Sequence, residues 1–289
     1  MRTGMTMVAW ATDLHLDHAE PGDVRAFIEA VRSSGATALL VGGDTAHAAV
    51  VDRRLVEIAD LTGIPVHFVL GNHDYYGGSI AGVHAKIGSL AHPGLHWLPA
   101  VGPRELAPDV ALVGHGGWGD ARLGDFAGSP VVLTDYVVID ELRRAFDLDA
   151  FTGTFGEGSP LEAELRRLGR DAADTLAPHL AAAAASCRQV VVLTHVPPFR
   201  EVCWHEGAIS GECWLPGFSC GAMGEVILAA ATAHPECSFT VLCGHTHSGG
   251  TARLAANLVA QTRAADYGRP DFVLLGVGDD GIVDAGRQR

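Results

Sequence analysis

Five short segments of this 289-residue chain carry side chains that bind metal ions, and each segment directly follows an apolar run. In chain order, these side chains are Asp13 and His15, Asp44, Asn72, His195, and His245 with His247. Any one of them alone is more simply explained as a turn or capping residue at the end of a strand. Core packing gives no reason for five such segments, so the ordered set indicates a metal site.

The apolar runs are short, rich in β-branched residues and bounded by glycine or polar residues, which is typical of buried strands. They cover residues 8–11, 38–41, 66–70, 190–193 and 239–243. Helical spacing at 23–33 and 50–61 separates the first three runs, which predicts repeated strand–helix–strand units and a parallel sheet. Because ligands of such sheets bind at the carboxyl ends of the strands, the five segments are expected to meet at one edge.

The spacing within the segments suits metal binding. Asp13 and His15 lie two residues apart in an extended segment, so both side chains point to the same side, and His245 with His247 repeats this spacing. Mixed carboxylate and imidazole ligands favour manganese, iron, zinc or nickel over magnesium or calcium. The set exceeds the needs of one ion, whereas two divalent or mixed-valence ions about 3.5–4 Å apart would use it well.

Written as a pattern, the segments read Asp-x-His, Gly-Asp, Gly-Asn-His-Asp, His and Gly-His-x-His between residues 13 and 247. This ordered pattern resembles that of the calcineurin-like metallophosphoesterase superfamily, and it spans most of the chain. The resemblance implies an α/β fold in which a two-sheet β-sandwich is flanked by helices (α/β/β/α). It also implies a centre of two transition-metal ions, with manganese, iron or zinc expected, that hydrolyses a phosphate ester.

Carried over residue by residue, the resemblance implies a place for each ligand. The first metal would be held by Asp13, His15 and His247. The second metal would be held by Asn72, His195 and His245. Asp44 would bridge both ions, and a metal-bound hydroxide would attack the phosphorus atom.

Two more residues of the Gly-Asn-His-Asp segment have implied catalytic roles. His73 would protonate the leaving oxygen or stabilise charge on the phosphoryl group, and Asp74, directly after it, would orient the imidazole. The glycines that precede ligands, Gly43, Gly71 and Gly244, are expected to permit the tight turns that aim those ligands inward.

The chain is expected to form a single domain over residues 1–289, with loop-rich insertions at about 75–189 and 197–221. The irregular loops 114–122 and 197–221 are expected to form the walls above the metals. The side chains in them that would contact the substrate are His115, Trp118, Arg122 and His205. A loop packed by its own tryptophan, a covering loop or a subunit interface would explain the same residues.

The charge of the chain restricts its partners. A formal net charge of −14 repels polyanions, so no extended nucleic-acid surface is expected. A small phosphorylated substrate is still compatible with this charge, because the metals set the local potential. Two divalent ions, two aspartates and one hydroxide leave a charge of about +1 at the floor of the pocket. The oligomeric state stays open.

The sequence indicates neither a membrane protein nor a secreted one. It has no apolar run of about 20 residues and no secretory signal after Met1, so no transmembrane helix and a cytoplasmic location are expected. None of the six cysteines forms a Cys-x-x-Cys pair, which favours reduced thiols. Cys203, Cys213 and Cys220 occur in one segment, and a disulfide or metal site among them stays open.

The leading hypothesis is an enzyme, a dinuclear metal-dependent phosphohydrolase that acts on a small phosphodiester or phosphomonoester. Protein serine/threonine phosphatases of the superfamily carry Asp-Arg-Gly soon after Gly-Asp, and Glu after Gly-Asn-His. This chain has Thr45-Ala46 after Asp44 and Asp74 after His73, which disfavours that class. The acidic charge likewise disfavours a nuclease. The alternative is a catalytically weak or inactive interaction module of the same fold, and the complete ligand set argues against it.

Overall fold

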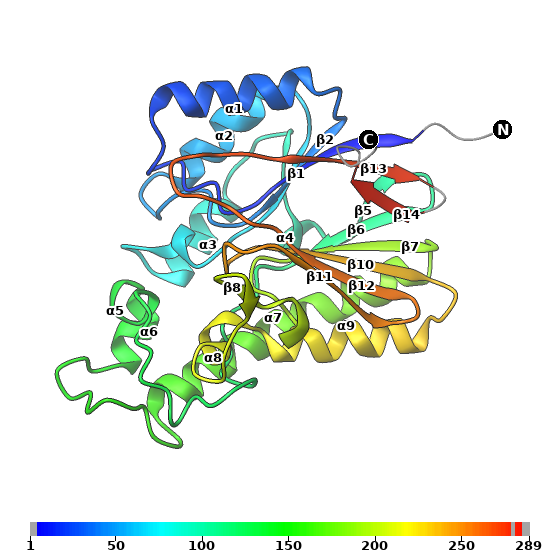
Figure 1. Cartoon of the computed structure of the whole chain (residues 1–289). Coiled ribbons are helices and arrows are strands. Elements are labelled where there is room, and N and C mark those ends of the chain that lie inside the picture. Colours follow the sequence, from blue (N-terminus) through cyan, green and yellow to red (C-terminus); the bar gives the residue numbers. More distant parts are fainter. Residues whose placement is uncertain (1–4, 279–280, 285–289) are drawn as a thin grey trace.

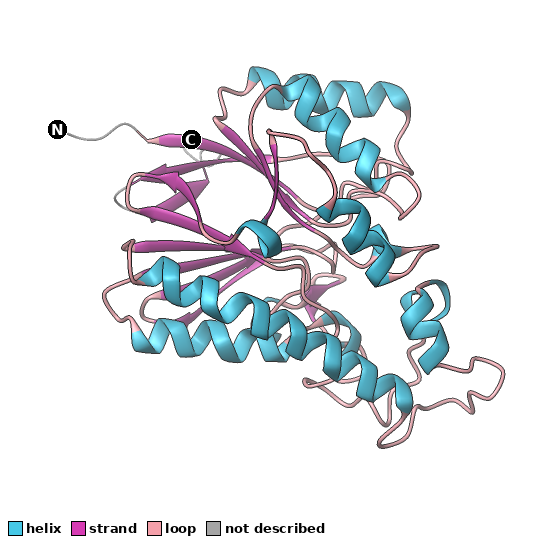
Figure 2. Ribbon diagram, turned by 180° about the vertical axis from the view of Figure 1, so that it is seen from behind, coloured by secondary structure: helices cyan, strands magenta, loops and turns pink. Residues whose placement is uncertain are grey.

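Two six-stranded sheets lie face to face between layers of helices (Figures 1 and 2). They belong to a computed structural model that describes residues 5–278 and 281–284. The arrangement is an α/β/β/α sandwich, so the predicted fold class is confirmed.

The first sheet contains the strands that precede the first three ligand segments. Its strands are β1 (Thr6–Ala11), β2 (Ala38–Gly42), β3 (Val66–Val69), β4 (Leu95–Trp97), β13 (Val273–Gly278) and β14 (Gly281–Asp284). They are ordered β14-β13-β1-β2-β3-β4, with β1 to β4 parallel and β13 antiparallel to β1. The helices α1 (Pro21–Ser33) and α2 (Val51–Thr62) connect the parallel strands and cover the outer face (Figure 1).

The second sheet contains the strands that precede the last two ligand segments. Its strands are β5 (Arg104–Ala107), β6 (Val110–Gly114), β7 (Gln189–Leu193), β10 (Ser238–Cys243), β11 (Gly250–Ala255) and β12 (Leu258–Thr262). They are ordered β11-β12-β10-β7-β6-β5, and the four central strands are parallel. The helices α7 (Pro160–Ala184) and α9 (Gly221–Ala233) cover the outer face of this sheet.

The remaining elements are short and surround the sandwich. They are α3 (Ile80–Gly88), α4 (Leu98–Val101), α5 (Asp135–Val138), α6 (Asp140–Ala145), α8 (Leu215–Phe218), the 3-10 turns η1 (His73–Tyr75) and η2 (Arg200–Val202), and the hairpin β8 (Trp204–His205) and β9 (Ala208–Ile209). The segment 75–189 is more regular than the insertion expected there, because it supplies β4 to one sheet and β5 and β6 to the other. Among the described residues, no helix is both long and apolar enough to cross a membrane.

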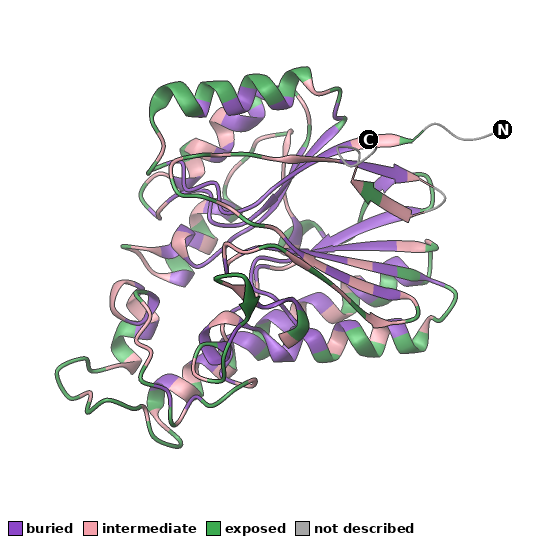
Figure 3. Cartoon of the chain, viewed as in Figure 1, coloured by how far each residue is buried: buried purple, intermediate pink, exposed green. Residues whose placement is uncertain are grey.

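The central strands are buried on both faces, which explains their continuous apolar runs (Figure 3). Successive side chains of a strand point to opposite faces. In β1, Ala9 packs beneath the helices, whereas Val8 and Trp10 pack between the two sheets. In β7, Val191 packs between the sheets and Val192 packs against the layer of α7 and α9. Three apolar layers therefore hold the sandwich together.

All six cysteines lie within the described residues and carry free thiols. In the cluster that the sequence left open, the thiol of Cys203 donates to the carbonyl oxygen of Phe218 at 3.3 Å. The thiol of Cys220 lies 3.9 Å from the carboxylate of Asp120. These thiols are therefore bonded to other groups and not to one another.

A buried histidine in β3 links the stability of the fold to pH. His67 is 5% exposed and stacks on His96 of β4, with ring centroids 4.8 Å apart. Burial, together with the neighbouring His96 and Arg104, lowers the pKa of His67 from 6.5 to about 4. Between these two values the unfolded chain binds a proton at this position and the folded chain does not. Stability is therefore lost as the pH falls through this window.

We expect the substitution His67→Phe, which keeps a planar ring and removes the titratable group, to reduce this acid sensitivity. The free energy of unfolding, measured by urea denaturation, should fall by about 2 kcal/mol more in the wild type than in the variant between about pH 7 and about pH 5. His234→Gln, at the more exposed end of α9, is the control and should keep the wild-type pH dependence. An equal loss in the wild type and His67→Phe would contradict this account.

Candidate metal centre

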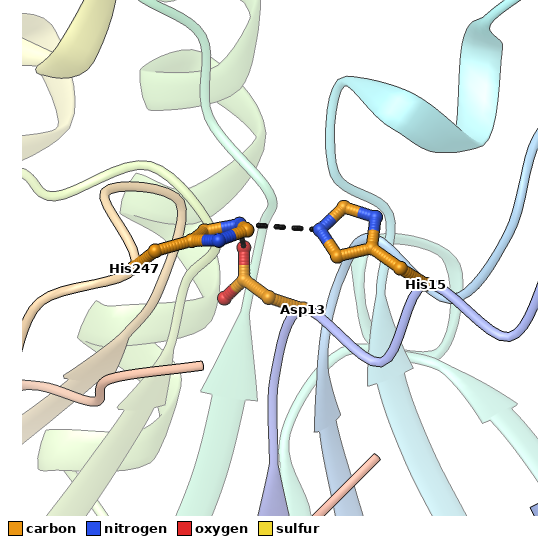
Figure 4. A group of neighbouring side chains, drawn as sticks. All are labelled: Asp13, His15 and His247. Carbon is orange, nitrogen blue, oxygen red and sulfur yellow. Dashed lines mark hydrogen bonds and ion pairs between the residues drawn. The ribbon is translucent and has the colours of Figure 1, made fainter. Parts of the chain in front are cut away.

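The predicted ligands follow the carboxyl ends of β1, β2 and β3 in one sheet and of β7 and β10 in the other. Figure 4 shows three of these ligands. Asp13 Oδ1 lies 3.4 Å from His247 Nε2, which in turn lies 3.2 Å from His15 Nε2. Nearby, Asn72 Oδ1 lies 3.0 Å from His195 Nε2. The two sheets therefore bring residues from opposite ends of the chain to one edge of the sandwich.

Asp44 lies between two groups of these side chains. Its Oδ1 is 3.4 Å from His195 Nε2, whereas its Oδ2 is 3.8 Å from His15 Nε2 and 4.0 Å from His73 Nε2. The residue is 1% exposed. Each carboxylate oxygen thus faces a different set of donors, which is the arrangement that a carboxylate bridging two ions requires.

Further hydrogen bonds determine which atom of three predicted ligands stays available. Nδ1–H of His195 donates to the carbonyl oxygen at the end of β2 at 2.9 Å, and Nε2–H of His245 donates to the carbonyl oxygen of Gly217 at 3.2 Å. The amide nitrogen of Asn72 donates to Asp135 at 2.9 Å. These bonds leave His245 Nδ1 as a possible metal ligand, and they leave His195 Nε2 and Asn72 Oδ1 facing each other at 3.0 Å, where a metal ion would replace their mutual hydrogen bond.

Five predicted ligands have left-handed backbone conformations. They are Asp13, His15, Asp44, His245 and His247, with φ of 53°, 40°, 52°, 72° and 54°. Only eight non-glycine residues in the described chain have positive φ, so these five are the majority. Each costs on the order of 1–3 kcal/mol. Backbone hydrogen bonds hold the conformation, since the N–H of His15 donates to the carbonyl of Asp44 at 2.9 Å.

Glycine is needed beside two carboxylates because there is no room for a larger residue. A Cβ on Gly71 would lie 2.2 Å from Asp44 Oδ1, and a Cβ on Gly244 would lie 2.1 Å from Asp13 Oδ2. Gly43 differs, because its φ of +91° lies in the region that favours glycine. The expected turn role therefore describes Gly43, whereas Gly71 and Gly244 allow the carboxylates a close approach.

Asp74 differs from its expected role, because backbone N–H groups occupy both of its oxygens. It accepts four hydrogen bonds of 2.8–3.0 Å from the N–H groups of residues 44–46 and Gly71. The carboxylate therefore turns inward to join two ligand loops and does not orient the ring of His73. Burial and the charge of Asp44 raise the pKa of Asp74 to about 7, although the backbone donors act in the opposite direction.

The two carboxylates closest to the predicted metals keep their negative charge. Burial opposes ionisation of Asp13, but the hydrogen bond with His247 and the charges of His195 and His247 together outweigh burial and lower the pKa of Asp13 to about 2. Burial opposes ionisation of Asp44 as well, yet the neighbouring His195 and His73 hold its pKa well below the usual range. Burial opposes protonation of His195, but the charge and hydrogen bond of Asp44, together with the charge of Asp13 and the carbonyl of Gly42, raise its pKa to about 10. The buried carboxylates thus demand positive charge beside them.

The chemistry of the donor set fits transition-metal ions. Burial lowers the pKa values of His15 and His245 to about 4, so both rings are neutral near pH 7 and offer a lone pair. Three overlapping groups have ligand atoms within 4.8 Å of one another: Asp13, His15 and His247; His15, Asp44 and His73; and Asp13, Asp44 and His195. Carboxylate, imidazole and amide donors in this number suit two ions.

A cavity of about 270 Å³ opens beside these groups, and His73 stands at its edge. The His73 ring stacks on Tyr76 with centroids 4.0 Å apart and meets the edge of His15 at 4.6 Å. Its Nε2 lies 3.5 Å from the hydroxyl of Tyr267. Of the four side chains expected to contact the substrate, His205 lines this cavity.

The other three expected contacts lie elsewhere, outside the lining of this cavity. Trp118 is 5% exposed and packs in the core with its ring 5.2 Å from that of Tyr75. Nδ1 of His115 accepts a hydrogen bond from the N–H of Gly117 at 3.0 Å. Nε of Arg122 lies 3.4 Å from the carboxylate of Asp120.

The glycine-rich loop 114–122 packs behind the site and forms none of its walls. A Cβ on Gly116 would lie 1.8 Å from the carbonyl oxygen of Leu70, and a Cβ on Gly119 would lie 2.2 Å from that of Gly217. The glycines therefore permit close backbone packing. From the sequence alone, the same glycines indicated an open loop.

Among the cavity residues that were not predicted from the sequence are Tyr76, Asp135 and Tyr267. Tyr76 stands three positions after His73, so its closeness to the Gly-Asn-His-Asp segment was an available signal. Tyr267 lies in the turn after β12 and stacks on His15 with centroids 4.2 Å apart. Asp135 and Tyr267 belong to no local pattern, and only tertiary packing brings them to the site.

Comparisons with known proteins identify a family and similar folds. The profile described as calcineurin-like phosphoesterase matches residues 6–249. The structure is similar to a dimetal phosphatase from Danio rerio, with a TM-score of 0.59 and 14% identity over 96% of this chain and 94% of that chain. It is similar to phosphopantetheinyl hydrolase from Mycobacterium tuberculosis, with a TM-score of 0.53 and 16% identity over 92% and 91% of the two chains.

A third similar structure is described as the anchor in the inner membrane complex of Plasmodium, with a TM-score of 0.53 and 11% identity over 99% of this chain and 87% of that chain. At these identities the structural likeness establishes the fold alone. No curated protein matches the chain in sequence.

We expect Asp74→Asn to weaken both the fold and metal binding, because an amide nitrogen would face backbone N–H groups that now donate to a carboxylate. The free energy of unfolding should fall by about 2–3 kcal/mol, and metal affinity should fall about 10–100-fold. Urea denaturation and a competition assay with a chromogenic chelator measure the two effects.

Asp120→Asn is the matched control for Asp74→Asn. Asp120 is fully buried and also accepts backbone N–H bonds, from Arg122, Gly221 and Ala222, but it does so at the start of α9. This control should lose stability and keep its metal affinity. If Asp74→Asn instead kept stability and metal but lost turnover, the residue would act through His73, as the sequence first suggested.

Proposed function

The chain belongs to the calcineurin-like phosphoesterase family, and from this premise we propose that it is a hydrolase of small phosphate esters with a dinuclear metal centre. The observation that carries the proposal is the position of Asp44. This buried carboxylate turns one oxygen toward His195 and the other toward His15 and His73. The arrangement is suited to holding two ions side by side.

The proposed ligands divide between the two ions as the family pattern implies. Those of the first ion are Asp13, His15 and His247, and those of the second are Asn72, His195 and His245. Asp44 is shared by both ions. When bound, two such ions supply Lewis acidity, which activates water and neutralises charge on the phosphoryl oxygens.

His73 is placed to move the proton at the leaving group. Its ring is held between Tyr76 and His15, and its Nε2 stays at the cavity beside the hydroxyl of Tyr267. During hydrolysis a water oxygen bonds to phosphorus, and the bond from phosphorus to the leaving oxygen breaks. Protonated His73 gives its proton to that oxygen, so the alcohol departs without charge.

A non-catalytic interaction module is the competing function. The Plasmodium neighbour described as an anchor shares the fold, so the fold alone does not distinguish the two functions. Catalysis is favoured by the full ligand set and by His73 at the cavity. To choose between catalysis and an interaction module, the metal-loaded chain is tested for release of p-nitrophenolate from a chromogenic phosphate ester. A chain that holds both ions and releases none would support the interaction module.

We expect the purified chain, loaded with manganese or zinc and desalted, to retain two ions per chain by elemental analysis. Asp44→Asn should retain at most one, because the bridging carboxylate contributes to both positions. Asp125→Asn, an exposed carboxylate that accepts a hydrogen bond from Gly128, is the control and should retain two. A single ion in the wild type, or two in Asp44→Asn, would refute the bridge.

We expect His73→Ala to keep its metal and to lose turnover by about 10²–10⁴-fold. The loss should be larger for an alkyl leaving group than for p-nitrophenol, because the poorer leaving group depends more on protonation. His234→Ala, on the far end of α9, is the control and should be as active as the wild type. Normal turnover with both leaving groups would exclude the proton-transfer role, whereas loss of metal would make His73 a ligand.

A further inference from the structure

A further carboxylate lies at the site and, unlike those of Asp13, Asp44 and Asp74, it lines the cavity. Asp135, at the start of α5, lines the cavity and is 7% exposed. Its Oδ1 accepts hydrogen bonds from the amide nitrogen of Asn72 at 2.9 Å and from the hydroxyl of Tyr76 at 2.5 Å. Both donors are neutral, and within the described residues no arginine, lysine or histidine forms an ion pair with Asp135. Among the described residues, Asp135 is therefore stabilised by hydrogen bonds from two neutral groups and by no ion pair.

The basic side chains that line the rest of the cavity are histidines, among them the proposed proton donor His73. Among its described lining residues there is no arginine and no lysine. Asp135 therefore lowers by one unit the positive charge expected at the floor with two ions bound. Only the side-chain amide of Asn72 separates this carboxylate from the proposed second ion.

This charge distinguishes the two kinds of phosphate ester. Near neutral pH a phosphodiester carries one negative charge, whereas a phosphomonoester carries nearly two, because its second pKa is about 6. The additional charge of a monoester would be placed close to a carboxylate that is buried and poorly screened by salt. The carboxylate of Asp135 should therefore disfavour binding of the dianion more than binding of the monoanion.

The walls provide a place for the second ester group that only a diester has. Tyr76 and Tyr267 line the cavity on the side of His73. Phe218 lines it on the side of His245, whose ring it meets edge-on at 5.4 Å. Flat aromatic surfaces of this kind pack against an apolar or planar group more readily than against the bare oxygens of a monoester.

We infer that the substrate is a phosphodiester and that the carboxylate of Asp135 selects it over phosphomonoesters. This inference rests on the proposed function and narrows it. Hydrolysis consumes one water, breaks one phosphorus–oxygen bond and yields an alcohol, a monoester dianion and a proton. The product carries one more negative charge than the substrate, so the carboxylate that admits the substrate also promotes release of the product.

Three chromogenic probes with the same leaving group test this selection in the metal-loaded chain. They are p-nitrophenyl phosphate, a dianion, and two monoanions, methyl p-nitrophenyl phosphate and bis(p-nitrophenyl) phosphate. Because the probes differ in intrinsic reactivity, the decisive quantity is the change between variants in the ratio of kcat/KM for diester over monoester. In Asp135→Asn, we expect this ratio to fall about tenfold for both diesters, because one charge is removed close to the substrate.

Asp125→Asn is the matched control, because it removes a carboxylate that lies outside the lining of the cavity. It should keep the wild-type ratio, and metal content is measured for every variant. An unchanged ratio in a metal-loaded Asp135→Asn chain would overturn the inference and leave the proposed function intact. Failure to hydrolyse any of the three probes would instead refute the proposed function, and this inference with it.

If Asp135→Asn releases its metal, a measurement on the wild type alone tests whether the site prefers monoanions to dianions. Dimethyl phosphate, a monoanion, and methyl phosphate, a dianion, are compared as competitive inhibitors. Tighter inhibition by dimethyl phosphate supports the selection of monoanions, and tighter inhibition by methyl phosphate overturns it.

Discussion

Two buried carboxylates in one small space are the constraint that organises this edge of the sandwich. Asp13 and Asp44 are 2% and 1% exposed, and the charge of Asp44 opposes ionisation of Asp13, although the neighbouring histidines keep the pKa of Asp13 low. Such a pair is tolerated only beside compensating positive charge. The second sheet supplies part of this charge through His195 and His247, and the proposed ions supply the rest. The left-handed ligands, the glycines and the four bonds to Asp74 all keep these groups close together.

The ligands and the cavity walls come from different parts of the chain. Every predicted ligand follows a central strand of a sheet, where three apolar layers fix the backbone. The walls come from α5, from α8 and from the turn after β12, which lie outside the central strands. The walls are not independent of the ligands, because Asp135 of α5 bonds Asn72 and the carbonyl of Gly217 in α8 bonds His245.

The sequence predicted the fold class and the gathering of the seven ligand positions, because each ligand directly follows a recognisable buried strand. It was less reliable where contacts depend on tertiary structure. Adjacency to His73 suggested that Asp74 orients its ring, but both oxygens of Asp74 bind backbone N–H groups. The glycine content of residues 114–122 suggested a wall of the substrate site, but these glycines instead permit close packing against neighbouring backbone. Asp135 was missed because no local pattern marks it. The assignment of ligands to ions stays a prediction.

The closeness of His15 and His247 has a consequence for folding. These residues are 232 positions apart in the chain, yet their Nε2 atoms lie within 3.2 Å of each other. An ion held by both acts as a cross-link between the first sheet and the second, and it closes most of the chain into one loop. Closing a longer loop removes more freedom from the unfolded chain, although only logarithmically. The ligands proposed to serve catalysis would therefore also stabilise the contact between the two sheets.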